Sequence, residues 1–103
     1  MDNKELHYLI KSVIDLNKKR YLIIKDEIDY IINNNIKNEN QIERKLDEML
    51  DILSFYENDD TLLTFRKLCK YYFNINPRAT VDYINFYREQ NDPEGVKFGN
   101  RNV

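Results

Sequence analysis

The chain has 103 residues and a net charge of −2, and 42% of its residues are hydrophobic while 33% are charged. These values are typical of one globular domain and argue against an intrinsically disordered chain or a strongly basic nucleic-acid-coating protein. No run reaches the roughly 18 apolar residues that a membrane span needs, and no basic-then-apolar leader opens the chain. With one cysteine there is no internal disulfide, so we expect a cytoplasmic protein that does not engage membranes.

The first predicted element is a long helix over residues 4–33. Apolar residues at positions 10, 14, 21, 24, 28 and 31 recur at near-heptad spacing, and only Asn17 interrupts the row. A break near residues 17–20 would instead give two shorter helices. The cluster Tyr21-Leu22-Ile23-Ile24 could also form the short strand of a winged helix-turn-helix fold. We favour one helix because Ile28 and Ile31 continue the same stripe.

Three shorter helices are predicted to follow. A helix over about 40–57 begins after an asparagine-rich turn, and one over about 61–73 follows the turn Asn58-Asp59-Asp60. Asn76 caps the last helix, which begins at Pro77 and runs to about Gln90. The sequence therefore predicts an all-α fold, a bundle of about four helices in a single domain over residues 1–91. Residues 92–103 are predicted to be a short, flexible tail.

The sequence offers little for catalysis, which needs several reactive groups that converge. The one histidine, His7, has no evident partner, and Cys69 lies mid-helix, where we interpret it as a small buried hydrophobe rather than a reactive thiol. One cysteine and one histidine cannot form a zinc site, and no glycine-rich loop is present to bind phosphate. We expect a protein that is not an enzyme and needs no cofactor or metal.

Acidic residues are concentrated between positions 37 and 60, which carry eight acidic and three basic residues, giving −5. Four of them fall at i, i+4, i+5 and i+8 on the predicted 40–57 helix. We call these four the acidic row: Glu43, Asp47, Glu48 and Asp51. Such a row is most often a solvated helix face. Its functional interpretation is a surface that docks a partner, with magnesium binding as a weaker alternative.

The stretch KLCKYYFNINPRATVDYINFYREQ, residues 67–90, has the outline of a helix-turn-helix. The candidate nucleic-acid-binding residues in this stretch and just before it are Arg66, Lys67, Lys70 and Arg78. The last helix, however, is apolar over about 220° of its circumference, and its narrow polar strip carries Asp82 and Glu89. A helix of this kind is either buried against several neighbours or forms a contact surface.

Tyrosines cluster in the second half of the chain. Tyrosine combines a large, rigid contact area with a polar tip and is favoured at protein interfaces. We therefore place Tyr71, Tyr83 and Tyr87 among the candidate partner-binding residues, together with the acidic row. The alternative is that a chain whose only alanine is Ala79 fills its core with aromatic side chains.

The segment LCKYYFNINPRATVDYINFYREQNDPEGVKFG resembles small proteins carried by plasmids and conjugative elements of low-GC bacteria, a resemblance that covers residues 40–99. The abundance of Asn, Ile and Lys, which have AT-rich codons, fits such a source. Proteins of this kind include anti-CRISPR and other anti-defence inhibitors, accessory factors that bind the origin of transfer, and bacteriocin-immunity-like four-helix bundles.

The resemblance implies a non-enzymatic inhibitor that binds and blocks a host defence nuclease, either a CRISPR effector or its guide-RNA complex. A DNA-binding accessory or regulatory protein of a plasmid or conjugative element is the alternative, and a bacteriocin-immunity-like bundle is a further one. The chain could also act as a homodimer, which would gather a larger positive footprint for nucleic acid.

Overall fold

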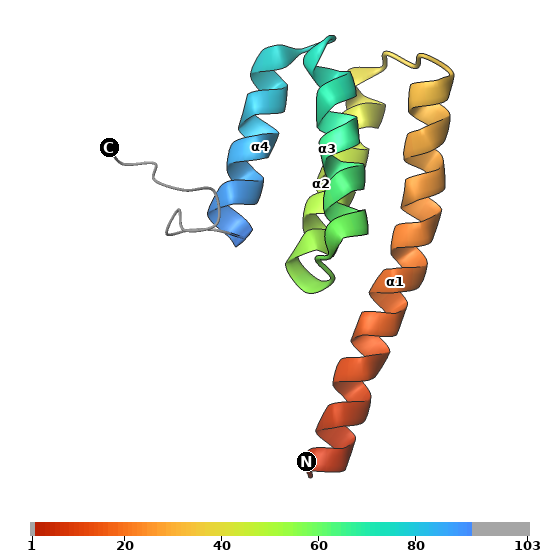
Figure 1. The fold of residues 1–103 in the computed structure, drawn as a ribbon, viewed down its shortest axis with the longest axis vertical. Coiled ribbons are helices and arrows are strands. Elements are labelled where there is room, and N and C mark those ends of the chain that lie inside the picture. The colour runs from red at the N-terminus through yellow and green to blue at the C-terminus, as the bar shows by residue number, and fades with distance from the viewer. Residues whose placement is uncertain (1, 92–103) are drawn as a thin grey trace.

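The computed structural model describes residues 2–91, which form four α-helices joined by short turns (Figure 1). The helices are α1 (Asn3–Asn33), α2 (Glu39–Phe55), α3 (Asp59–Phe73) and α4 (Pro77–Asn91). The predicted all-α fold is confirmed, and the first helix is unbroken. No residue within 2–91 forms a strand, so the winged-helix alternative, with its strand at residues 21–24, is wrong. The predicted tail, residues 92–103, lies outside the described residues.

Short polar side chains begin the helices. Each accepts a hydrogen bond from a backbone amide three residues later, which satisfies one of the free amides of the first turn. The pairs are Asp2 with Glu5 (2.7 Å), Asn38 with Gln41 (2.9 Å), Asn58 with Thr61 (2.9 Å) and Asn76 with Ala79 (3.0 Å). These caps involve only residues close in sequence, so the helix starts were predictable from local sequence.

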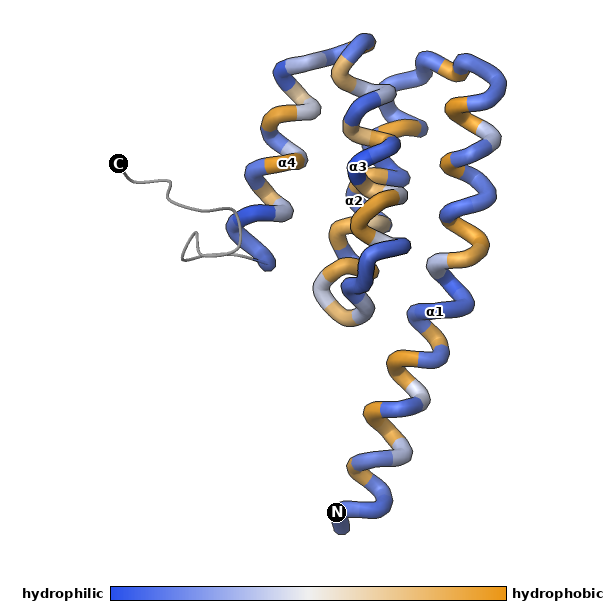
Figure 2. The backbone as a smooth tube through the Cα atoms, in the orientation of Figure 1, coloured by the Kyte–Doolittle hydropathy of each residue, from blue (hydrophilic) through white to orange (hydrophobic). Residues whose placement is uncertain are grey.

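Helices α2 and α3 form the centre of the bundle. Helix α1 packs against both from one side and α4 packs against both from the other, and within residues 2–91 α1 and α4 do not touch (Figure 1). Hydrophobic residues recur along all four helices (Figure 2). The fully buried aliphatic side chains are Ile24, Ile28, Ile31, Ile42, Leu46, Met49, Ile52, Leu53 and Leu68. None of these side chains comes from α4.

Helix α1 is much longer than the helices it packs against. Its 31 residues span about 46 Å, whereas the 17 residues of α2 and the 15 of α3 span about 26 and 23 Å. The first buried residue of α1 is Tyr21, and residues 3–20, which we call the α1 tip, project beyond the bundle (Figure 1). The predicted apolar stripe is thus buried only in its second half, and Ile10 and Ile14 are 51% and 40% exposed.

The point where α1 enters the bundle is fixed by a polar contact with α3. The Tyr21 hydroxyl donates to Asp60 Oδ2 at 2.9 Å and lies 2.8 Å from Thr64 Oγ1. Lys25 Nζ lies 3.2 Å from Asp60 Oδ1. The Tyr21 hydroxyl, followed by the Lys25 ammonium, holds the pKa of Asp60 below its usual range.

Replacing Tyr21 with phenylalanine removes the hydroxyl and leaves buried Thr64 without this partner. We expect Tyr21→Phe to lower the free energy of unfolding by about 1–2 kcal/mol in urea titrations at neutral pH. The matched control is Tyr30→Phe on the same helix, where the side chain is 62% exposed and the change should have little effect.

The same variant should change how stability depends on pH. Because the folded-state pKa of Asp60 is lowered, its stabilising effect is complete above the unfolded-state pKa and is lost as the pH falls through the folded-state pKa. Tyr21→Phe should raise the pKa of Asp60 in NMR titrations. It should also lose less stability than the parent protein between about pH 5 and pH 2. An unchanged Asp60 pKa would contradict this account.

Candidate functional site

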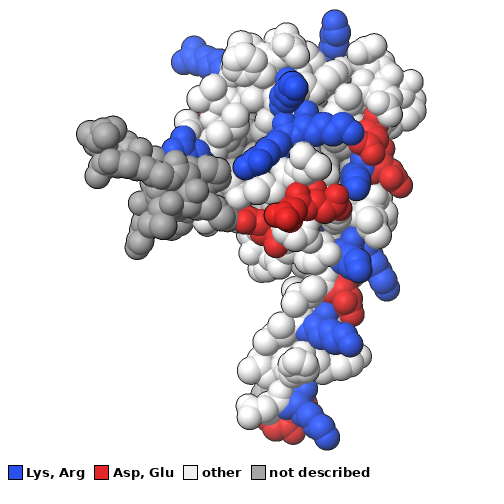
Figure 3. Space-filling model, viewed as in Figure 1, with Lys and Arg blue, Asp and Glu red and all other residues white. Residues whose placement is uncertain are grey.

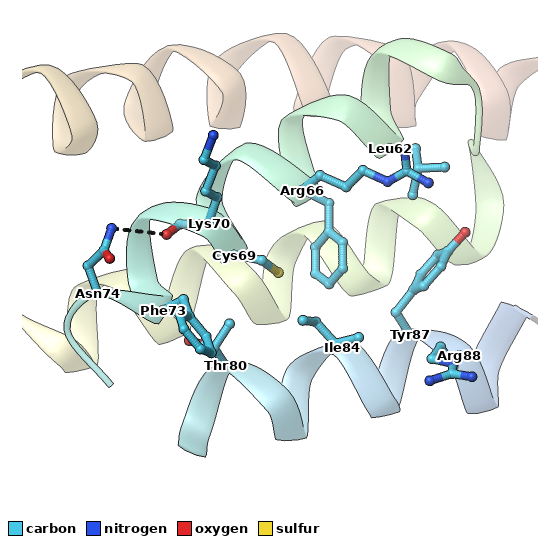
Figure 4. Close-up of a pocket in the computed structure, with 11 residues that line it drawn as sticks. Leu62, Arg66, Cys69, Lys70, Phe73, Asn74, Thr80, Ile84, Tyr87 and Arg88 are labelled. Carbon is cyan, nitrogen blue, oxygen red and sulfur yellow. Dashed lines mark hydrogen bonds between the residues drawn. The ribbon is translucent and has the colours of Figure 1, made fainter. Parts of the chain in front are cut away.

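An open groove runs between α3 and α4 and encloses about 750 Å³ (Figure 4). We call it the α3–α4 groove; its lining residues are Leu62, Phe65, Arg66, Cys69, Lys70, Phe73, Asn74, Thr80, Ile84, Tyr87 and Arg88. Two large apolar side chains remain accessible in it, since Phe73 is 51% exposed and Ile84 is 37% exposed. Their exposure on facing helices gives this surface an apolar interior.

The groove exists because the apolar arcs of α3 and α4 are wider than their contact. On α4 only Thr80, Tyr83 and Tyr87 are buried. Val81, Ile84 and Phe86, at the two edges of the 220° apolar arc predicted for this helix, are exposed, so the arc is wider than the surface that α4 buries. On α3, Phe73 is half exposed because α4 does not cover it.

Basic side chains border the groove. Arg66 and Lys70 line it from α3, and Arg88 lines it from α4. Arg66 extends toward Leu62 along one edge, whereas the Lys70 ammonium extends away from α4 (Figure 4). Lys and Arg side chains gather over α3 on this face of the molecule (Figure 3). An apolar groove with a basic edge complements the apolar face of an amphipathic segment whose flank is acidic.

Cys69 lies in the groove but is only 5% exposed. Burial raises the pKa of the thiol to about 12, so the nucleophilic thiolate is scarce at neutral pH. The sequence-based interpretation of Cys69 as a small buried hydrophobe is confirmed. Cys69 is therefore not an activated thiol.

Two members of the acidic row face buried tyrosine hydroxyls. Glu43 accepts a hydrogen bond from Tyr72, whose ring is fully buried in α3. Burial, and then the neighbouring Glu43 carboxylate, raises the pKa of Tyr72. Burial, and then the Asp47 carboxylate, raises the pKa of Tyr83 in α4. Glu43 thus links α2 to α3 through the Tyr72 phenol group.

The other two members form ion pairs. Glu48 lies 2.8 Å from Lys45, whose ammonium also lies 2.9 Å from Glu27 of α1, and Asp51 pairs with Arg20 of α1. All four acidic side chains therefore contact or influence groups within the chain. Asp47 and Asp51 are exposed, and Glu43 and Glu48 are half-buried. The row as a docking surface stays a prediction.

The predicted tyrosines lie largely inside the bundle. Tyr83 and Tyr87 are 9% and 2% exposed, and Tyr71 is half-buried. The Tyr71 hydroxyl donates to the carbonyl oxygen of Ile36 at 2.6 Å, and the Tyr87 hydroxyl donates to Glu57 at 2.9 Å. Among the predicted partner-binding residues, only Tyr87 lines the α3–α4 groove.

The predicted nucleic-acid-binding residues do not all lie in one place. Arg66 and Lys70 line the groove, whereas Lys67 lies 2.9 Å from Asp29 of α1 and Arg78 is exposed in the first turn of α4. His7 is exposed on the α1 tip. Within the described part of the chain, no group of three or more potential ligand side chains could hold a metal ion.

Sequence reasoning did not single out most of the groove residues, among them the exposed apolar residues Phe73 and Ile84. The signal that could have found them is the width of the apolar arcs on two consecutive short helices, since one contact can cover only part of each arc.

Comparison with known proteins found no family model, curated protein or solved structure that matches this chain. Within residues 2–91, no helix is both long and apolar enough to cross a membrane.

The burial of Cys69 predicts how its thiol reacts. We expect the native protein to react with a disulfide reagent such as DTNB far more slowly than the urea-unfolded chain at pH 8, because the folded thiol is both inaccessible and protonated. The matched measurement is the single thiol of the unfolded chain under the same reagent concentration. Comparable rates in the two states would show that Cys69 is open to solvent.

Proposed function

We propose that this chain is a non-enzymatic binding protein that acts by docking a segment of a larger protein in the α3–α4 groove. The observation that carries the proposal is the exposure of Phe73 and Ile84 on facing helices. Accessible apolar side chains in a groove bordered by basic ones are typical of sites that receive an amphipathic helix. The preferred segment would present apolar side chains to the groove and acidic side chains to Arg66.

The proposed biological role is inhibition of a host defence nuclease, of the anti-CRISPR type. The resemblance of residues 40–99 to proteins of mobile elements supports this role, and the groove supplies a surface through which a small chain could hold a large partner. In this mechanism the inhibitor occupies a region of the effector, or of its guide-RNA assembly, that must stay free for target binding or activation. The acidic row is a secondary candidate contact.

Nucleic-acid binding is the second candidate function, favoured by the basic side chains over α3 (Figure 3). Arg66 and Lys70 could contact phosphates from this face. Two observations favour the docking of a protein segment over nucleic-acid binding. Lys67 pairs with Asp29, and the apolar residues Phe73 and Ile84 lie next to the basic edge, where a phosphate backbone offers them no partner.

Target cleavage by a purified CRISPR effector, with and without this chain, tests the proposed role. We expect the parent protein to inhibit cleavage and to co-elute with the effector. Ile84→Asp should weaken binding at least tenfold, because it places a carboxylate in the apolar interior of the groove. The matched control is Leu63→Asp, since Leu63 is 64% exposed on α3 and does not line the groove.

The outcomes separate the two candidate functions. Equal loss of binding in both variants, or none in either, would contradict the groove as the docking site. A salt-dependent gel shift that Arg66→Ala with Lys70→Ala abolishes, without inhibition of any effector, would favour nucleic-acid binding instead.

A further inference from the structure

The α1 tip carries a second exposed apolar surface, at a distance from the groove. Its apolar side chains are between 40% and 68% exposed, although they lie on a single helix face. They are Leu6, Leu9, Ile10, Val13, Ile14 and Leu16. A helix on the surface of a globular protein normally buries such an apolar face against another element.

This face continues the one that α1 buries in the bundle. At about 100° per residue, the six apolar residues fall within an arc of about 160° that also contains the directions of Ile24 and Ile28. Those two isoleucines are buried against α2 and α3. Lys4, Lys11 and Lys18 lie outside the arc, on the polar side. The tip therefore presents the same kind of apolar face that α1 buries in the bundle, but neither α2 nor α3 covers it there.

We propose that the α1 tip of a second copy of this chain covers this face, so that two tips pack antiparallel in a symmetric dimer. The inference is independent of the α3–α4 groove, because no residue of the tip lines that groove.

The orientation follows from where the bundle lies. Beyond residue 20, α2 and α3 occupy the same face of α1 that the partner would use. A partner helix running parallel would have to pass through that occupied space, and each bundle would obstruct the other. An antiparallel partner ends where the bundle begins, and the two bundles then lie at opposite ends of the paired tips.

The order of residues along the tip suits a twofold axis near residue 12. Positions 7, 10, 14 and 17 share the heptad row, and they are symmetric about that point. Ile10 of one copy then lies opposite Ile14 of the other, and His7 lies opposite Asn17. The two polar members of the row thus meet each other, which favours this register over one that places them against aliphatic side chains.

The charge of the tip is complementary to one end of the bundle. Residues 3–20 carry five basic and two acidic side chains, giving +3, and one of the basic residues, Arg20, pairs with Asp51 of its own chain. The turn between α2 and α3 lies at the end of the bundle from which α1 projects (Figure 1). The first turn of α3, which follows it, carries Asp59 and Asp60, and Phe55 at the end of α2 is 60% exposed. In the register centred near residue 12, the start of one tip lies level with residue 20 of the other copy and so reaches this acidic end.

Light scattering after size exclusion tests the proposal on the full chain at about 1–100 µM. We expect a mass of twice 12.6 kDa for the parent protein. Ile10→Glu combined with Ile14→Glu should be monomeric and should keep the cooperative unfolding of the bundle, because both residues are already exposed in the single chain. The matched control is Tyr8→Glu, since Tyr8 is 70% exposed on the opposite side of the tip; it should stay dimeric.

Single cysteines in a Cys69→Ala background test the orientation. In an antiparallel pair centred near residue 12, the two Val13 positions lie within about 3 Å along the axis, whereas the two Leu6 positions lie about 18 Å apart. Val13→Cys should therefore form an intermolecular disulfide readily and Leu6→Cys should not. Equal crosslinking of both would indicate a parallel pair and overturn the antiparallel proposal.

Other outcomes would overturn the proposed dimer. A parent protein that is monomeric throughout the concentration range overturns the dimer. If that monomer floats with anionic lipid vesicles, and Ile10→Glu with Ile14→Glu abolishes flotation, the face belongs to a membrane surface instead. A dimer that survives the double variant places the interface elsewhere and likewise overturns the proposal.

Discussion

The mismatch in length between α1 and its neighbours organises this molecule. A helix of 31 residues cannot be covered by helices of 17 and 15 residues, so one apolar face is divided into a buried half and an exposed half. Tyr21 marks the boundary, and its hydroxyl contact with Asp60 and Thr64 fixes where α3 meets α1. The position of α3 then places α4, because α4 has no contact with α1 among the described residues.

Much of the fold was predictable because its determinants are local. The asparagine caps and Pro77 set where helices begin, and the Ile24, Ile28 and Ile31 spacing identified the buried stripe. The roles of the acidic row were not predictable in the same way. Whether Glu43 faces solvent or the Tyr72 hydroxyl depends on which helix lies beside α2, and helical periodicity carries no information about neighbours.

The α3–α4 groove was likewise only partly predictable from the sequence. Sequence spacing correctly gave α4 an apolar arc too wide for one contact, but it could not say which part of that arc remains uncovered. The answer follows from the arrangement of helices: α4 packs on α2 and α3 alone, so Ile84 and its surroundings border open space. Alanine scarcity adds to the effect, because large side chains such as Phe73 replace the small ones that would let helices close together.

The two exposed surfaces have different consequences for binding. If the tips pair, the two bundles lie at opposite ends of the dimer, and each carries its own α3–α4 groove. Two equivalent grooves joined through rigid helices convert a second docking event into an intramolecular one, provided that the partner offers two suitably spaced segments. A partner with a single segment gains nothing from the pairing. The distance between the two grooves, which α1 would set, would then favour partners that carry two copies of the bound segment. The groove residues would determine which sequence is bound.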